Sequence, residues 1–236
     1  MSQFSDLSQF LPQLLAGMVV NFEIAFIALV VGLVLGGLLC LLSLSGGILK
    51  VIVATLVGVM RAAPTFVVMF FLLNAIPSGT AITIGEMSFG LAPSPLMAVA
   101  LSLVPYSASY VVDNGIEAVM QLRRGSMLGA LLFLPNITRA FFVLVMSSST
   151  GAAIGVNEGI AVILRAAAPM TSLADKMVLF AIGILCFGLT LQLGFFLMRR
   201  LQRQLGRYAV PAGGLEAAPA LLRMHQAAVP VWCAAE

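Results

Sequence analysis

The chain has 236 residues, of which 61% are hydrophobic and 9% charged, and its formal net charge at pH 7 is +3. Soluble domains carry about 25% charged residues, so this composition excludes an ordinary water-soluble globule. The small positive charge gives no reason to expect a nucleic-acid partner. Long continuous apolar stretches, in place of short alternating ones, predict helices that cross a bilayer. We therefore expect an all-α integral membrane bundle.

The first two expected spans are Leu14–Leu44 and Ala62–Ile76. Between them Lys50–Met60 is apolar, but a span centred on Arg61 would bury a charge at a cost of at least about 2.5–3.5 kcal/mol. We therefore expect Lys50–Met60 to be an interfacial or partly inserted helix, with Arg61 at the membrane boundary. Pro64 then falls in the first turn of the second span, where its missing N–H does no harm.

Three further spans are expected in the rest of the chain: Pro95–Val112, Ala140–Val156 and Lys176–Met198. Pro77–Pro95 is rich in Pro, Gly, Ser and Thr and predicts a loop outside the membrane. Asp113–Arg124 is polar and is also expected outside, whereas Met127–Leu134 is apolar but short and ends at Pro135. Asn157–Asp175 is expected to be a mixed connection.

Basic residues mark one side of the predicted membrane domain. Four arginines follow the last span at once: Arg199, Arg200, Arg203 and Arg207. Juxtamembrane Lys and Arg are typical of the cytoplasmic side, so we expect the C-terminus inside and, five spans earlier, the N-terminus outside. Arg165 is the basic residue that breaks this pattern. The expected organisation is an extracytoplasmic segment (1–13), a transmembrane domain (14–207) and a cytoplasmic tail (208–236) that could be disordered.

Six short segments along the chain form a series. They are Leu14-Leu15-Ala16-Gly17, Asn21-Phe22-Glu23-Ile24-Ala25, Arg61-Ala62-Ala63-Pro64-Thr65, Ser107-Ala108-Ser109-Tyr110 with Asp113, Leu134-Pro135, and Gly155-Val156-Asn157-Glu158. In order and spacing the series resembles the polar amino acid family of ABC importer permeases, the group that includes histidine, arginine and glutamine importers. The resemblance covers roughly Leu14 to Arg207.

The resemblance implies a type I ABC importer permease fold with about five transmembrane helices, in a multi-pass protein of the bacterial inner membrane. It implies three partners besides lipid: a second permease chain, the same or related, an ABC ATPase subunit and an extracytoplasmic solute-binding protein. The solute would be small and polar, and we expect an amino acid. The chain has no Gly-x-x-x-x-Gly-Lys-Ser/Thr phosphate-binding loop. We therefore expect ATP and Mg²⁺ in a partner subunit, and no cofactor, metal or catalytic residue in this chain.

In the family, a cytoplasmic loop after the third span docks on the ATPase. The corresponding coupling residues here would be Glu117, Ala118, Arg123, Arg124, Gly125, Leu134 and Pro135. Their spacing departs from the family's Glu-Ala-Ala and Gly pattern, so coupling through a second, more typical permease would also fit. The alternative is a solvated cytoplasmic loop whose arginines only obey the positive-inside rule.

Polar residues in or beside the spans are candidates for the translocation path or its gate. The set is Arg61, Pro64, Tyr106, Tyr110, Ser148, Thr150, Asn157 and Glu158. Ordinary alternatives exist: a snorkelling interface anchor for Arg61, packing for the two tyrosines, and hydrogen bonds between helices for the hydroxyl and amide groups.

Two other functions stay open from the sequence. The altered coupling region favours a helical membrane scaffold or accessory subunit without transport of its own. A secondary transporter or channel is the other, although few ionisable residues lie inside the spans for ion coupling and no inverted repeat is evident. A partner chain with an intact Glu-Ala-Ala loop would favour the importer, whereas ion-dependent uptake without an ATPase would favour the secondary transporter.

Overall fold

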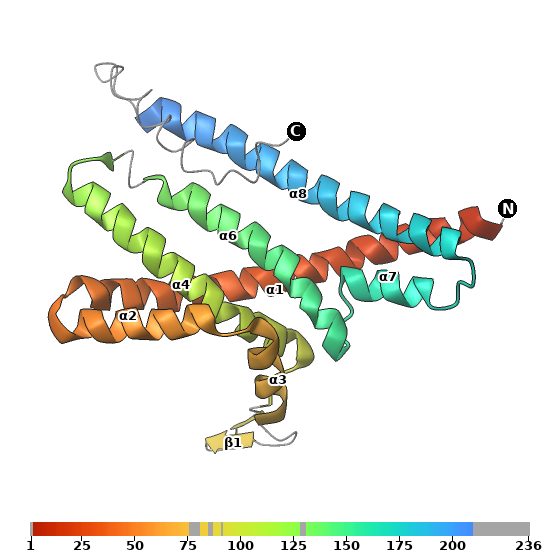
Figure 1. Cartoon of the computed structure of the whole chain (residues 1–236), viewed down its shortest axis with the longest axis horizontal. Coiled ribbons are helices and arrows are strands. Elements are labelled where there is room, and N and C mark those ends of the chain that lie inside the picture. Colours follow the sequence, from red (N-terminus) through yellow and green to blue (C-terminus); the bar gives the residue numbers. More distant parts are fainter. Residues whose placement is uncertain (1, 76–80, 85–86, 91, 128–130, 210–236) are drawn as a thin grey trace.

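The computed structural model describes residues 2–75, 81–84, 87–90, 92–127 and 131–209 of the chain (Figure 1). Its elements in chain order are α1 (Ser2–Leu44), α2 (Gly47–Ala62), α3 (Thr65–Ala75), strands β1 (Ala81–Ile84) and β2 (Met87–Gly90), α4 (Pro95–Arg123), α6 (Phe133–Ser147), the 3-10 helix η1 (Ser148–Ile154), α7 (Gly159–Ala167) and α8 (Leu173–Ala209). The predicted helical class is confirmed. The antiparallel β1–β2 hairpin, which pairs Ala81 with Gly90, falls in the segment predicted as a loop.

Four helices are long and apolar enough to cross a membrane, and a bent helix pair brings the number to five. The four are Gln9–Leu44, Pro95–Arg123, Phe133–Ile154 and Leu173–Arg200. The pair is α2 and α3, which are bent by 94° relative to each other. The expected count of about five spans therefore holds if α2 and α3 together make one broken span.

The predicted second span, Ala62–Ile76, is wrong in its limits. α3 has 11 residues and is about 16 Å long at 1.5 Å per residue, whereas the hydrocarbon core is about 30 Å thick. α2 instead packs beside α1 and α4 for its whole 16 residues (Figure 1). Pro64 sets the bend, because the residue before a proline is held out of the helical region and Ala63 has φ −69° and ψ 117°.

The centre of the bundle is the crossing of α1 and α4. A Cβ atom added at Gly36 would lie 2.6 Å from the Ala108 carbonyl oxygen. One added at Gly32 would collide with Ser107 Oγ. Small residues let helix backbones approach this closely in lipid. The buried apolar core around the crossing consists of Ile24, Ala25, Ala28, Met69, Val99, Ala100, Leu103, Leu144, Val145 and Val156.

α8 lies along the outside of the bundle (Figure 1). Only 11% of its best membrane window is buried, compared with 61% for α4. Two glycines of α8 pack against side chains of inner helices. Gly194 lies against Phe142 of α6, and Gly183 lies against Ile163 of α7. α8 is therefore the helix with most of its surface left for lipid or another chain.

Helices α1, α4, α6 and α8 extend beyond the limits expected from the sequence, and α7 is an additional helix. α4 continues through Asp113–Arg124 to Arg123, where a loop was predicted, and α6 already begins at Phe133. α7 occupies part of the predicted connection Asn157–Asp175. The predicted end of α4 was wrong because its polar residues Asp113 and Asn114 have partners on α2 and α6. The helix can therefore continue past them.

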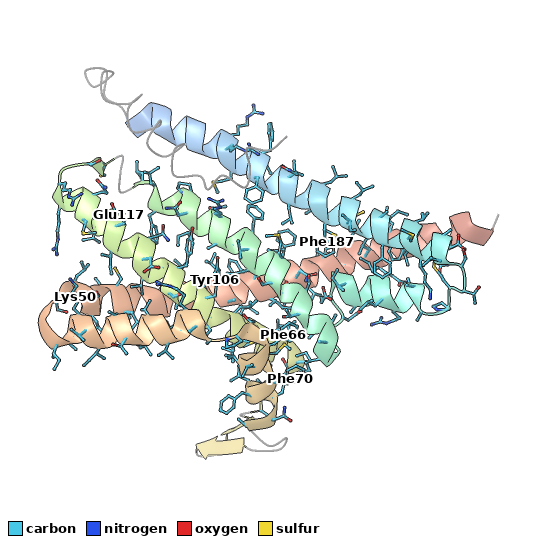
Figure 2. All side chains as sticks on the ribbon, viewed as in Figure 1. Lys50, Phe66, Phe70, Tyr106, Glu117 and Phe187 are labelled. Atoms are coloured by element: carbon cyan, nitrogen blue, oxygen red, sulfur yellow. The ribbon has the colours of Figure 1, made fainter. Side chains whose placement is uncertain are left out.

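The basic ends of the helices gather on one side of the molecule. Figure 1 shows the C-terminal ends of α1, α4 and α8 on the left and the N-terminus on the right. Lys50 lies at this left end, as Figure 2 shows, and Arg123 ends α4 there. The grouping is the one that the positive-inside argument predicts. Residues 210–236 of the predicted tail lie outside the described residues.

Candidate functional site

A buried polar cluster joins α1 to the short helices that follow α6. Asn21, Ser148 and Glu158 are each 0% exposed, and we term them the Asn21 cluster. Asn21 Nδ2 donates to Ser148 Oγ and to Glu158 Oε2, both at 2.9 Å. Asn21 Oδ1 accepts a hydrogen bond of 3.0 Å from the Gly159 backbone N–H. One side-chain amide therefore fastens α1 to both η1 and α7.

Glu158 is also the N-cap of α7. Its carboxylate accepts hydrogen bonds of 2.9 Å from the backbone N–H groups of Ile160 and Ala161. An anion is favoured at this end of a helix, where N–H groups lack partners. Glu158 lies in the connection between the spans that end at Ile154 and begin at Leu173. Burial raises the pKa of its carboxyl, and the hydrogen bonds from Ile160, Asn21 and Ala161 oppose that shift.

The surroundings of the Asn21 cluster are closely packed. A Cβ atom added at Gly17 would lie 2.9 Å from the Glu158 carbonyl carbon, and one at Gly159 would collide with the Phe187 ring. Figure 2 shows Phe187 near the crossing of α8 with α1. Two predicted path residues, Ser148 and Glu158, therefore meet here in a closed contact between helices.

A second polar feature lies on the open face of α4. Tyr106, Tyr110, Asp113 and Glu117 follow one another at intervals of four, three and four residues, which puts them on one side of a helix. We term these four residues the α4 stripe. Tyr110 is half-buried and the other three are exposed, whereas the residues between Tyr106 and Tyr110, Ser107, Ala108 and Ser109, are buried. The Tyr106 and Tyr110 ring centroids are 6.1 Å apart.

Arg61 joins the α4 stripe from the end of α2. Its Nη2 lies 2.6 Å from Asp113 Oδ2, and the two side chains are 58% and 55% exposed. Asn114, next to Asp113, accepts a hydrogen bond of 2.7 Å from Asn136 Nδ2 of α6. Adjacent residues of α4 therefore tie this helix to α2 on one side and to α6 on the other.

Arg139 approaches the α4 stripe from α6. It is exposed, and it lies three residues, about one helical turn, after Asn136, which bonds to Asn114 of α4. In the part of the chain that the structure describes, no group accepts a hydrogen bond from its guanidinium and no carboxylate pairs with it. Figure 2 places Tyr106 in the middle of the bundle, away from the end where Lys50 and Glu117 lie.

The other path candidates are dispersed. Pro64 stands at the bend between α2 and α3. Thr150 Oγ1 is buried, and the described residues offer it no hydrogen-bond partner. Asn157 Oδ1 accepts a hydrogen bond of 3.0 Å from Arg165 Nη2 at an exposed position. These residues lie on different elements from the α4 stripe, and no hydrogen bond among the described residues joins them to it.

The predicted coupling residues occupy two helix ends. Glu117, Ala118 and Arg123 belong to the last turns of α4, and Arg124 is its C-cap. Gly125 follows with φ +79° and reverses the chain direction. Leu134 and Pro135 lie in the first turn of α6, where proline is tolerated because its N–H would have no helical partner. Residues 128–130 between the two ends lie outside the described residues.

No group of three or more His, Cys, Asp or Glu side chains in the described ranges is arranged to hold a metal ion. What the chain offers at the α4 stripe, with Arg61 and Arg139, is two guanidinium groups, two carboxylates and two phenols. These groups can bind a small polar solute through hydrogen bonds and charge, but nothing among them forms a nucleophile and base pair.

The comparisons place this architecture among transport proteins by fold. The chain is similar to one chain of a solved structure described as the crystal structure of an amino acid ABC transporter with histidines. The two align with a TM-score of 0.59 and 16% sequence identity, over 84% of this chain and 98% of the other. No family model and no curated protein matches the sequence. The chain is thus a multi-pass helical membrane protein with an ABC transporter permease fold.

Sequence reasoning missed three residues of these two features. Asn21 and Asp113 entered only as parts of the resemblance, and Arg139 was not singled out. An amide inside an apolar span is itself a usable signal, because it requires a partner in lipid. The partners were not recognisable, since Ser148 and Glu158 lie 127 and 137 residues from Asn21.

Proposed function

We propose that this chain is the membrane-spanning subunit of an ATP-driven ABC importer in the bacterial inner membrane. The observation that carries the proposal is the fold shared with a chain of an amino acid ABC transporter over nearly the whole of both chains. A small polar solute, an amino acid by that likeness, would cross between two such chains. A separate ATPase subunit and an external solute-binding protein would complete the complex.

The described helix ends support this arrangement. α4 ends at Arg123 and α6 begins at Phe133, and the described residues of the turn between them, 124–127 and 131–132, are mostly exposed at the end of the bundle that carries the basic residues. A soluble ATPase would bind this turn and the α4 end that contains Glu117. Closure of the ATPase dimer on ATP would then shift the helices between inward- and outward-facing states.

The test is purification of the tagged full-length chain from its native membranes in mild detergent. We expect an ATPase with a phosphate-binding loop to co-purify, and its recovery to fall several-fold in the variant Arg123→Glu/Arg124→Glu. Arg165→Glu, an exposed arginine at the other end of the bundle, is the matched control and should leave recovery unchanged.

Other results would assign a different function. Absence of any ATPase from preparations that retain other membrane complexes would contradict the importer and favour a scaffold or a secondary transporter. If an ATPase binds the double variant and the unaltered chain equally, the importer proposal still holds. The ATPase contact would then lie on a second permease chain.

A further inference from the structure

The exposed surface of this molecule is of two kinds. On α8 it is mostly apolar: Ile184, Leu185 and Leu189 are 71%, 62% and 68% exposed, and no charged residue lies between Lys176 and Arg199. Such a surface suits lipid. The open side of α4 carries two phenols and Asp113 instead, within a helix that also qualifies as a span.

Lipid is a poor cover for this side of α4. A charged group at the bilayer centre costs at least about 2.5–3.5 kcal/mol, so such groups face protein or water-filled cavities. The Arg61–Asp113 pair reduces that cost, yet more than half of each side chain stays exposed. Arg139 lies in the span Phe133–Ile154 with no carboxylate beside it in the described structure. The surface as it stands therefore requires water or another polar partner.

The charge in the middle of this surface has a definite sign. Arg61 pairs with Asp113, and Glu117 lies away from Tyr106, at the end of the bundle where Lys50 lies (Figure 2), with a hydrogen bond from Gln121. Arg139 of α6 is therefore the positive charge of this middle part that pairs with no carboxylate among the described residues. A guanidinium presents its N–H groups as a planar fork that matches a carboxylate, and it stays charged at any ordinary pH. The phenol groups of the stripe add donors that a carboxylate can also use.

We propose that the α4 stripe, with Arg61 and Arg139, lines a water-filled passage, and that Arg139 is the site in it that attracts the carboxylate of the solute. The proposal rests on the proposed function, since it takes the second permease chain as the opposite wall. It adds the position of the passage on this chain and the residue that selects for an anionic group.

The test uses the reactivity of single cysteines. In a background with Cys40, Cys186 and Cys233 replaced by alanine, Tyr106→Cys is introduced into the full chain and kept in native membrane vesicles. Two small membrane-impermeant methanethiosulfonates are applied, one anionic (ethylsulfonate) and one cationic (ethyltrimethylammonium). We expect labelling by both, with the anionic reagent favoured several-fold after correction for rates on a free thiol.

Three controls isolate the role of Arg139. Adding Arg139→Gln should abolish the preference for the anionic reagent, whereas Arg139→Lys should keep it. Leu189→Cys on the apolar face of α8 should not react with either reagent. Tyr110→Cys provides a second reporter on the stripe if the Tyr106 variant does not give a monodisperse protein.

Several results would overturn the proposal. Protection of both reporters from both reagents would mean that lipid or protein covers the stripe, and a disulfide-linked dimer in place of labelling would mean that a second copy seals it. Labelling without a charge preference, or with a preference that persists in Arg139→Gln, would show that Arg139 is not an anion site. ATPase recovery is measured in the same preparations, so a protected stripe with a bound ATPase contradicts only this inference and leaves the importer proposal standing.

Discussion

The side-chain amide of Asn21 is expected to contribute strongly to the stability of the fold. Asn21→Ala leaves the Gly159 N–H without its partner and takes one hydrogen bond from the buried Glu158 carboxylate, which keeps those from Ile160 and Ala161. An orphaned buried group costs about 1–3 kcal/mol. We expect the apparent Tm of the detergent-purified chain to fall by about 5 °C or more. Tryptic digestion with rising temperature gives the measurement.

Asn74→Ala is the matched control for the Asn21 prediction. Asn74 is exposed, and its amide bonds only to the Phe70 carbonyl oxygen one turn earlier in α3. Its replacement should move the Tm by less than about 1 °C, because exposed substitutions of this kind stay within about 0.5 kcal/mol. Equal Tm values for the two variants would show that the Asn21 cluster does not hold the helices together.

The Arg61–Asp113 pair is tested by exchanging its charges. Arg61→Asp and Asp113→Arg, made singly, leave two like charges facing each other on the open side of α4. We expect each to lower the yield of monodisperse protein several-fold, and the double exchange to recover most of it. Fluorescence-detected size-exclusion chromatography compares the three variants. If the double exchange is no better than either single variant, the pair has no specific role.

At the level of single residues, the sequence located polar groups better than it assigned their partners. Glu158 and Ser148 were candidates for the translocation path. Both lie in the buried Asn21 cluster. Their link to Asn21 depends on how α1, η1 and α7 pack, over sequence separations that no local pattern records. The Arg61–Asp113 contact was missed because Arg61 was assigned to the membrane boundary.

Among the elements, the close crossing of α1 and α4 gives a sharp prediction. Gly36→Ala places a methyl group 2.6 Å from a backbone carbonyl oxygen of α4, which cannot move aside as a side-chain tip can. Overpacking of this kind costs about 1–3 kcal/mol, so we expect a Tm several degrees lower. Gly37→Ala meets nothing within 4 Å and should leave the Tm unchanged or slightly raised, because alanine is the better helix former.

The two glycine variants differ by one position on the same helix, so their comparison removes effects of composition and expression. A Tm that falls equally in both would point to a general intolerance of α1 to substitution. A Tm that falls in neither would mean that α1 and α4 are further apart in the membrane than the described structure has them.

Helix existence was predictable from the sequence, whereas helix limits were not. Apolar runs revealed α1, α4, α6 and α8 because a bilayer demands long continuous apolar segments. Asp113 and Asn114 were taken as the end of a span, yet partners on α2 and α6 let α4 continue past them. The 94° bend at Pro64 turns what hydropathy presents as one crossing into two short helices.

For the whole molecule, the arrangement of charge fixes an orientation that can be measured. The turn between α1 and α2 and the end of α4 lie on the same side (Figure 1), and Lys50 and Arg124 make that side basic. The opposite side holds the connection between α7 and α8, where Thr171 is exposed. The positive-inside rule then places Ser45 in the cytoplasm and Thr171 outside.

An impermeant maleimide applied to intact cells tests this orientation. In the cysteine-free background, Thr171→Cys should be labelled at once and Ser45→Cys only after the membrane is permeabilised. Arg165 and Lys176 argue the other way, but Asn157 holds Arg165 through a hydrogen bond, and the two are outweighed by the four arginines at the C-terminal end of α8. Labelling in the reverse order would show that the bundle has the opposite orientation in the membrane. The turn between α4 and α6 would then face away from any cytoplasmic ATPase, and the importer proposal would fail with it.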